Sequence, residues 1–229
     1  MKFLIILISM VLFLNAQTVT LIHKPVPRLS KGEKKFKKIN SYGWSDFHLG
    51  WQVSYFDVVS FNTKPSDGKH FELPGGKAVF REILHIGKAT KKLNNRSQQY
   101  LAKAIMKPAY FWKYPQPLLN DYTFYTLRFI DAKDGKLKAI ETLDDVQQFL
   151  GNIDTEAEIL LWIMASDHPG RRSYSYKKVG RNYRVRFLDS DMGECYFHEY
   201  FRYYDEKGKV MKEKTLREVH VKGCVEIMI

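Results

Sequence analysis

The C-terminal part of the chain contains four β-type segments separated by very short connections. β-Branched and aromatic residues are frequent in these segments, and each connection contains a glycine. Because connections this short join antiparallel neighbours, they predict a meander sheet. The expected strands are Ser173–Val179, Tyr183–Leu188, Cys195–Tyr204 and Lys209–Val219.

Two short helices are expected just before this sheet. The first covers Asp144–Leu150 and ends at Gly151. The second follows Asp154, which we expect to cap it, with Glu158 as its electrostatic partner. Apolar residues at helical spacing predict that one face of the second helix is buried. Those residues are Ile159, Leu160, Ile163 and Met164.

The first half of the body is less regular. Alternation favours a strand over Trp51–Phe61, and an Asp-Gly turn favours a hairpin of Phe124–Ile130 with Leu137–Thr142. Lys77–Leu93 fits both a helix face and an alternating strand, and we interpret it as a helix; Asn95–Lys107 is a second helix. The predicted fold class is α+β, with helices packed on an antiparallel meander sheet and a C-terminal half that is mainly β.

The first sixteen residues have the pattern of a secretion signal. Lys2 supplies a positive charge, Phe3–Leu14 is an uninterrupted apolar run, and Ala16 is a small residue at the expected cut. The run is shorter than the roughly 20 residues that cross a bilayer. We therefore expect residues 17–229 to be a soluble extracytoplasmic protein, periplasmic or secreted, with no membrane span. The alternative is an uncut N-terminal anchor.

Residues 17–39 are expected to form an N-terminal strand and a basic arm. Gln17–His23 alternates like a half-buried strand. In residues 24–38, seven basic residues accompany Glu33 alone, within a chain of net charge +12. Outside the cytoplasm, such a run favours an anionic surface as its partner, and we expect no nucleic acid. The alternative is a solvated spacer.

Residues 40–229 are expected to form one α+β body. Its length is sufficient for a core that needs no metal to fold. Three prolines interrupt the segment Pro108–Pro117. If the body has two lobes, they divide near residues 108–120.

The two cysteines, Cys195 and Cys224, are predicted to form a disulfide, because an oxidising compartment favours the bridge. Pairing Tyr204 with Lys209 across the preceding turn would place Cys195 opposite Glu218. The chain would then bend at Gly223 to bring the sulfur atoms together. The alternative is a nucleophilic Cys195 with His198, but residues i and i+3 of a strand face opposite sides.

Other pairs of reactive residues match no established catalytic or metal-binding pattern. Asp167-His168 and the segment Ser45–His48 contain acids beside histidines, without a recognisable nucleophile motif. Glu82 and His85 would share a helix face, but no second ligand pair accompanies them. We therefore expect no cofactor and no metal. An extracytoplasmic hydrolase that uses Asp167 and His168 is the alternative function.

An aromatic cluster among prolines is the most unusual local composition of the chain. Rigid aromatic side chains on a stiff loop can stack on sugar rings or on a partner peptide, and a basic pair could border a groove for an anion. The candidate binding residues are Tyr110, Phe111, Trp112, Tyr114, Arg171 and Arg172. The leading hypothesis is a non-catalytic binding module for an envelope component or a protein partner.

Overall fold

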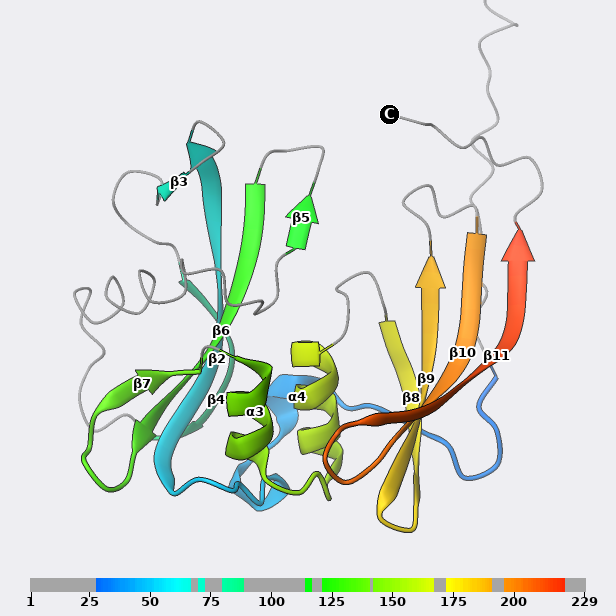
Figure 1. Ribbon diagram of the computed structural model, residues 1–229, viewed down its shortest axis with the longest axis horizontal. Helices are drawn as coiled ribbons and strands as arrows, with labels where there is room; N and C mark the ends of the chain where they lie inside the picture. The colour runs from blue at the N-terminus through cyan, green and yellow to red at the C-terminus, as the bar shows by residue number, and fades with distance from the viewer. Residues whose placement is uncertain are drawn as a thin grey trace, which may run out of the picture.

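The computed structural model describes residues 28–66, 70–72, 80–88, 114–116, 121–140, 142–166, 172–190 and 196–220. These residues form two antiparallel sheets and two α-helices (Figure 1). The described part is therefore mainly β with some helix, which agrees with the predicted α+β class at that level. Within these residues, no helix has the length and hydropathy needed to cross a membrane.

The N-terminal sheet is built around two long neighbouring strands, β2 (Val53–Ser66) and β6 (Asp121–Asp131). The sheet order is β3-β2-β6-β5, with β4 also paired to β2 and β7 to β6. The predicted hairpin around Gly135 is confirmed as β6 and β7. The shorter strands are β3 (His70–Glu72), β4 (Phe80–Gly87), β5 (Tyr114–Gln116) and β7 (Leu137–Ala139).

The helix predicted within Lys77–Leu93 is wrong, because Phe80–Gly87 forms strand β4 against β2. A register shift gives the reason. Leu84 pairs with Val58 and Glu82 pairs with Val59, so Ile83 is an extra residue in the ladder. This bulge interrupts the two-residue period and produces spacings that resemble those of a helix. The predicted helix Asn95–Lys107 lies outside the described residues.

The C-terminal sheet confirms the predicted meander. Its order is β1-β8-β9-β10-β11, and every neighbouring pair is antiparallel. Each of the four long strands begins and ends within two residues of its predicted position. The strands are β1 (Lys34–Lys35), β8 (Arg172–Val179), β9 (Asn182–Ser190), β10 (Tyr196–Tyr204) and β11 (Val210–His220).

The predicted register of the last hairpin is wrong. Tyr204 pairs with Val210, and Glu218 pairs with His198 rather than lying opposite Cys195. Two register shifts, at Glu199/Tyr200 and at Tyr203/Tyr204, place extra residues in β11 that simple counting from the turn misses. Cys195 and Cys224 themselves lie outside the described residues.

The two helices, α3 (Leu143–Leu150) and α4 (Glu156–Ser166), lie between the sheets (Figure 1). One core cluster joins residues of both helices and both sheets. Leu161 and Ala157 of α4 are buried along with the predicted stripe residues Ile159 and Ile163. Because α4 is apolar on nearly every side, it can pack against both sheets at once.

The N-terminus of α4 is capped one residue later than predicted. The Thr155 hydroxyl accepts a hydrogen bond from the Glu158 amide at 3.2 Å. Thr155 is therefore the cap, and Asp154 lies one residue before it. The buried Glu158 carboxylate accepts hydrogen bonds from the backbone amides of Asp154 and Thr155, and from the amide of His48 in a loop distant in sequence. Burial raises the pKa of Glu158, although these amide hydrogen bonds act to lower it. Glu158 therefore joins the helix start to residues 47–49.

Residues 28–38 of the basic arm are attached to the C-terminal sheet, so a solvated spacer does not describe them. Lys34 and Lys35 pair with Tyr176 and Ser175 as strand β1. The Glu33 side chain is 1% exposed and forms ion pairs with two arginines of β9, Arg184 and Arg186, each at 3.0 Å. The remainder of the arm and the predicted strand Gln17–His23 lie outside the described residues.

A second anchor of the N-terminal segment is the Glu156 carboxylate at the start of α4. It accepts hydrogen bonds from the hydroxyls of Tyr42 and Tyr176, both at 2.6 Å, and from the Lys37 amide at 3.0 Å. Burial alone would raise the pKa of Glu156, but the hydrogen bonds outweigh burial and lower it. Glu156 thus ties residues 37–42 to both α4 and β8.

Candidate binding pocket

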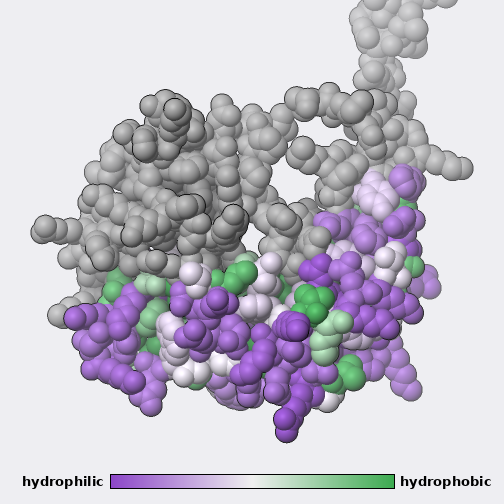
Figure 2. Space-filling model, in the orientation of Figure 1, coloured by the Kyte–Doolittle hydropathy of each residue, from purple (hydrophilic) through white to green (hydrophobic). Residues whose placement is uncertain are grey.

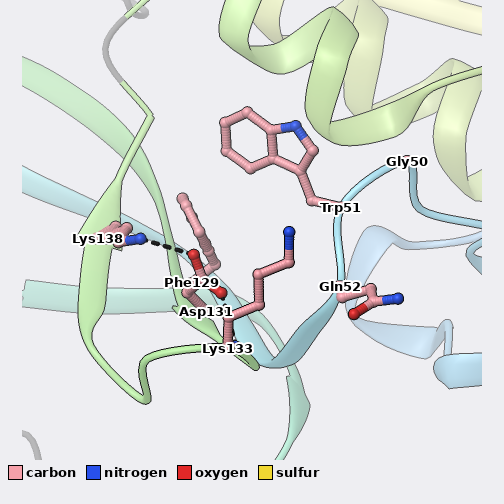
Figure 3. Close-up of a pocket in the computed structure, with 7 residues that line it drawn as sticks. All are labelled: Gly50, Trp51, Gln52, Phe129, Asp131, Lys133 and Lys138. Carbon is pink, nitrogen blue, oxygen red and sulfur yellow. Dashed lines mark hydrogen bonds and ion pairs between the residues drawn. The ribbon is translucent and has the colours of Figure 1, made fainter.

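A pocket of about 480 Å³ lies where the loop before β2 meets the β6–β7 hairpin (Figure 3). Trp51 and Phe129 form an aromatic wall, with ring centroids 5.1 Å apart. We call this site the Trp51 pocket. Its lining residues are Gly50, Trp51, Gln52, Phe129, Asp131, Lys133 and Lys138.

Close backbone packing positions Trp51. The Gly50 amide donates to the Phe149 carbonyl at the end of α3, at 2.9 Å. A Cβ atom on Gly50 would lie 2.6 Å from the Gln148 carbonyl oxygen, so only glycine fits here. The indole of Trp51 also packs edge-on against the ring of Phe149. The aromatic wall therefore rests on the hydrophobic core.

The hairpin supplies the charged groups of the pocket. Asp131 ends β6, Lys138 lies on β7, and the ammonium of Lys138 contacts the Asp131 carboxylate at 2.6 Å. The Ala132 amide donates to the Gln52 carbonyl at 3.0 Å and joins the hairpin to the opposite rim. Figure 3 shows the Lys133 side chain extending between Trp51 and Asp131, while the Gln52 side chain points away.

The charges of the pocket are unequal. Hydrogen bonds to Asp131 and Asp134 raise the pKa of Lys138, and the bond from Lys138 lowers the pKa of Asp131. All three groups are therefore ionised at neutral pH, and the two aspartates that contact Lys138 carry one negative charge more than it offsets. Among the described residues, the Lys133 ammonium has no ion-pair partner. The charge of Lys133 helps to lower the pKa of Asp131, but Lys133 forms no ion pair within the described residues, so its ammonium is presented beside the aromatic wall.

This arrangement suits a ligand with a flat apolar face and an anionic group. The faces of sugar rings stack on indole, and a carboxylate or phosphate can accept from an ammonium. Asp131 can accept hydrogen bonds from hydroxyl groups beside the anionic group. No histidine lines this pocket, and none lines two further pockets that described residues form near Ile153 and near Phe201.

The segment Ser45–His48, considered above for catalysis, has a structural role. The Asp46 carboxylate accepts a hydrogen bond from the Gly43 amide at 2.8 Å. His48 contacts Asp154 at 2.9 Å, and with Glu158 these two place three metal-type ligand atoms within 4.8 Å of one another. The Glu158 carboxylate already accepts three backbone amides, however, so we assign this cluster to holding the loop.

Glu82 and His85 form a surface pair on strand β4, not on a helix face. Their side chains are 2.6 Å apart and each is more than half exposed. The bulge at Ile83 explains how residues three apart can meet on a strand. His198, predicted to be separate from Cys195, contacts the Thr215 hydroxyl at 3.2 Å.

Most of the candidate residues predicted from the sequence fall outside the described part of the chain. Tyr114 begins β5 and pairs with Thr123, and Arg172 begins β8 and pairs with Leu188. These two positions belong to different sheets. The residues outside the described ranges are Tyr110, Phe111, Trp112, Asp167, His168 and Arg171.

Sequence reasoning missed the Trp51 pocket. It treated Trp51 as a strand residue and Lys133 as part of a turn. A usable signal was the bulky aromatic directly after Gly50, two residues before β2 begins. The approach of residue 51 to residue 133 depends on the pairing of β2 with β6.

The fold and the site define the described part as a mainly β protein with two antiparallel sheets, an interposed helix pair and a surface pocket of aromatic and charged residues. No protein-family model matches the chain, and neither a curated protein nor a solved structure matches it.

Proposed function

We propose that the protein is an exported, non-catalytic binding protein whose Trp51 pocket recognises an acidic sugar of the cell envelope. The observation that carries this proposal is the position of Lys133, which has no ion-pair partner among the described residues, beside the wall of Trp51 and Phe129. A sugar ring against the indole would bring a ring carboxylate or phosphate to the ammonium. Asp131, held by Lys138, would accept from a neighbouring hydroxyl.

The pocket chemistry favours binding over catalysis. A general base needs a titratable group free to exchange a proton near neutral pH. Asp131 has a lowered pKa because Lys138 and the Lys133 amide bind it, so it stays ionised. Two of the described histidines, His48 and His85, lie outside the pocket in exposed pairs with Asp154 and Glu82.

Substitutions at Lys133 and Trp51 are expected to separate the contribution of the cation to sugar binding from that of the stacking surface. Lys133→Gln should weaken binding of oligogalacturonate about 10-fold, the usual effect of one charge-assisted hydrogen bond, and leave binding of the neutral sugar maltotriose unchanged. Trp51→Ala should weaken both about 10-fold, because each sugar loses its stacking surface. Isothermal titration calorimetry measures these affinities.

Lys136→Gln is the matched control, because Lys136 is exposed in the same turn but does not line the pocket. This variant should bind like the wild type, and all variants should melt at similar temperatures. If oligogalacturonate does not bind the wild type, or binds Lys133→Gln equally well, the proposed ligand class is wrong.

Export has its own test. The protein purified from the cells that produce it should begin at Gln17, because the apolar run Phe3–Leu14 ends at a small residue before this position. A peptide digest made without reductant should contain Cys195 linked to Cys224. Mass spectrometry detects both features. A product that starts at Met1, or carries both cysteines as thiols, would contradict export to an oxidising compartment.

A further inference from the structure

One face of the C-terminal sheet collects a large share of the positive charge of the chain. Side chains from β8, β9 and β11 project to this face, and the segment 28–33 lies against it. We call it the basic face. Its eight basic residues are Arg28, Lys31, Lys177, Arg184, Arg186, Lys212, Lys214 and Arg217.

Contacts place the N-terminal segment on this face. The Arg28 carbonyl accepts from the Arg186 guanidinium at 2.6 Å, and the Lys31 carbonyl accepts from Lys177 at 3.4 Å. On the edge strand β11, Lys214 pairs with Phe201, and Lys212 pairs with Tyr203 two residues further on. Alternation on a strand puts these lysines on the same side as Phe201, whose ring lies 4.2 Å from the Arg184 guanidinium.

The acids on this face are buried beneath the bases. Glu33 and Glu199 have side chains that are 1% and 2% exposed, and they bind Arg184, Arg186 and Arg217 from below. These pairs fix the arginines while hiding the negative charge from solvent. Arg186 is itself buried, but the eight bases outnumber the two acids, so these described residues give the face a formal charge of +6. In the view of Figure 2, hydrophilic residues predominate at this end of the molecule.

A shallow pocket of about 470 Å³ lies within the basic face. Its lining is mixed: it contains Arg28, Arg186 and Arg217, the Glu199 carboxylate that pairs with the last two, Ser30, and the apolar Phe201 and Leu216. Leu29, beside Arg28 in the chain, is 42% exposed. An exposed leucine beside cationic side chains suits the boundary between headgroups and acyl chains.

We propose that the basic face docks the protein onto a membrane surface that contains anionic phospholipids. The basic residues are spread over an open sheet surface instead of a narrow channel, which fits a planar array of headgroups. The Trp51 pocket belongs to the other sheet, so docking leaves it accessible. This inference does not depend on the ligand of the Trp51 pocket.

Vesicle co-sedimentation tests the proposal. The purified protein, with the same N-terminus in every variant, should bind mixed phosphatidylglycerol–phosphatidylcholine vesicles and bind pure phosphatidylcholine vesicles much less. The double variant Lys212→Gln/Lys214→Gln should lower the partition coefficient on mixed vesicles about 25-fold, because each cation near an anionic surface contributes about a factor of five. Binding should also weaken as salt is added.

The control removes two lysines elsewhere. Lys136→Gln/Lys207→Gln has the same net charge as the test variant but changes exposed turn residues off the basic face, and it should bind mixed vesicles nearly as well as the wild type. Equal losses in both double variants would show a net-charge effect and overturn the proposal. Equal binding to both vesicle types would also overturn it, as would binding to soluble heparin without binding to mixed vesicles. Circular dichroism confirms that each variant is folded.

Discussion

Replacing Asp57 with alanine is expected to lower the free energy of unfolding by about 3–5 kcal/mol, because it leaves a buried arginine without its carboxylate. Asp57 and Arg128 are directly opposite on β2 and β6, and their side chains are 1% and 3% exposed. The Arg128 Nε donates to Asp57 at 2.8 Å, and the Tyr55 hydroxyl donates to the same carboxylate at 2.8 Å. Alanine removes the acceptor for both donors.

Glu82→Ala provides the control for Asp57→Ala. Glu82 also pairs with a neighbour, His85, but both side chains are more than half exposed, so its removal should cost less than about 1 kcal/mol. Urea unfolding followed by circular dichroism measures both changes. The double variant Asp57→Val/Arg128→Met should recover most of the loss, since an apolar pair removes the buried charge as well. Equal effects of Asp57→Ala and Glu82→Ala would contradict this account.

The parts of the fold that were predicted correctly depend on local signals. Gly180 and the turn Asp205–Gly208 lie between segments that alternate, so the strands on either side of each were predictable. Gly151 marked the end of α3. In each case, residues that are neighbours in the chain determine the local structure. The sheet of β8–β11 is built almost entirely from such neighbouring contacts.

The incorrect predictions involve bulges and contacts between distant segments. The bulge at Ile83 gives the sequence of β4 a spacing that resembles a helix. Two register shifts in β11 give Glu218 a different partner on β10 from the one predicted. A bulge is one extra residue, and it is stabilised by the partner strand rather than by its own sequence. Counting from a turn therefore gives the strand correctly and its register incorrectly.

The Trp51 pocket and the basic face could not be predicted from the sequence, for a related reason. The Trp51 pocket requires residue 51 to meet residue 133, and the basic face requires the segment 28–33 to lie across β9. For the second site, the sequence contained one clue. Glu33 is the only acid in the basic run, and an isolated acid among seven bases signals a specific buried partner. Nothing in the local sequence identified Arg184 and Arg186 as those partners.

Gly208→Ala is expected to be the other severely destabilising substitution, at about 4 kcal/mol. Gly208 ends the predicted turn before β11 and has φ of 77°, where an L-residue costs about 1–2 kcal/mol. It also packs against α4. The Trp162 indole donates to the Gly208 carbonyl at 2.8 Å, and a Cβ atom on Gly208 would lie 2.4 Å from the indole ring. Relieving that overlap would cost a further 1–3 kcal/mol, roughly.

Gly180→Ala isolates the backbone contribution to this effect. Gly180 has φ of 61°, similar to Gly208, but no other atom lies within 4 Å of where its Cβ would be. Its replacement should therefore cost only about 1 kcal/mol. The difference between the two variants, measured by urea unfolding, reports the contact between the turn and Trp162. If both glycines cost the same, the turn does not pack on α4 as described, and the C-terminal sheet is held to the helices by its other core residues alone.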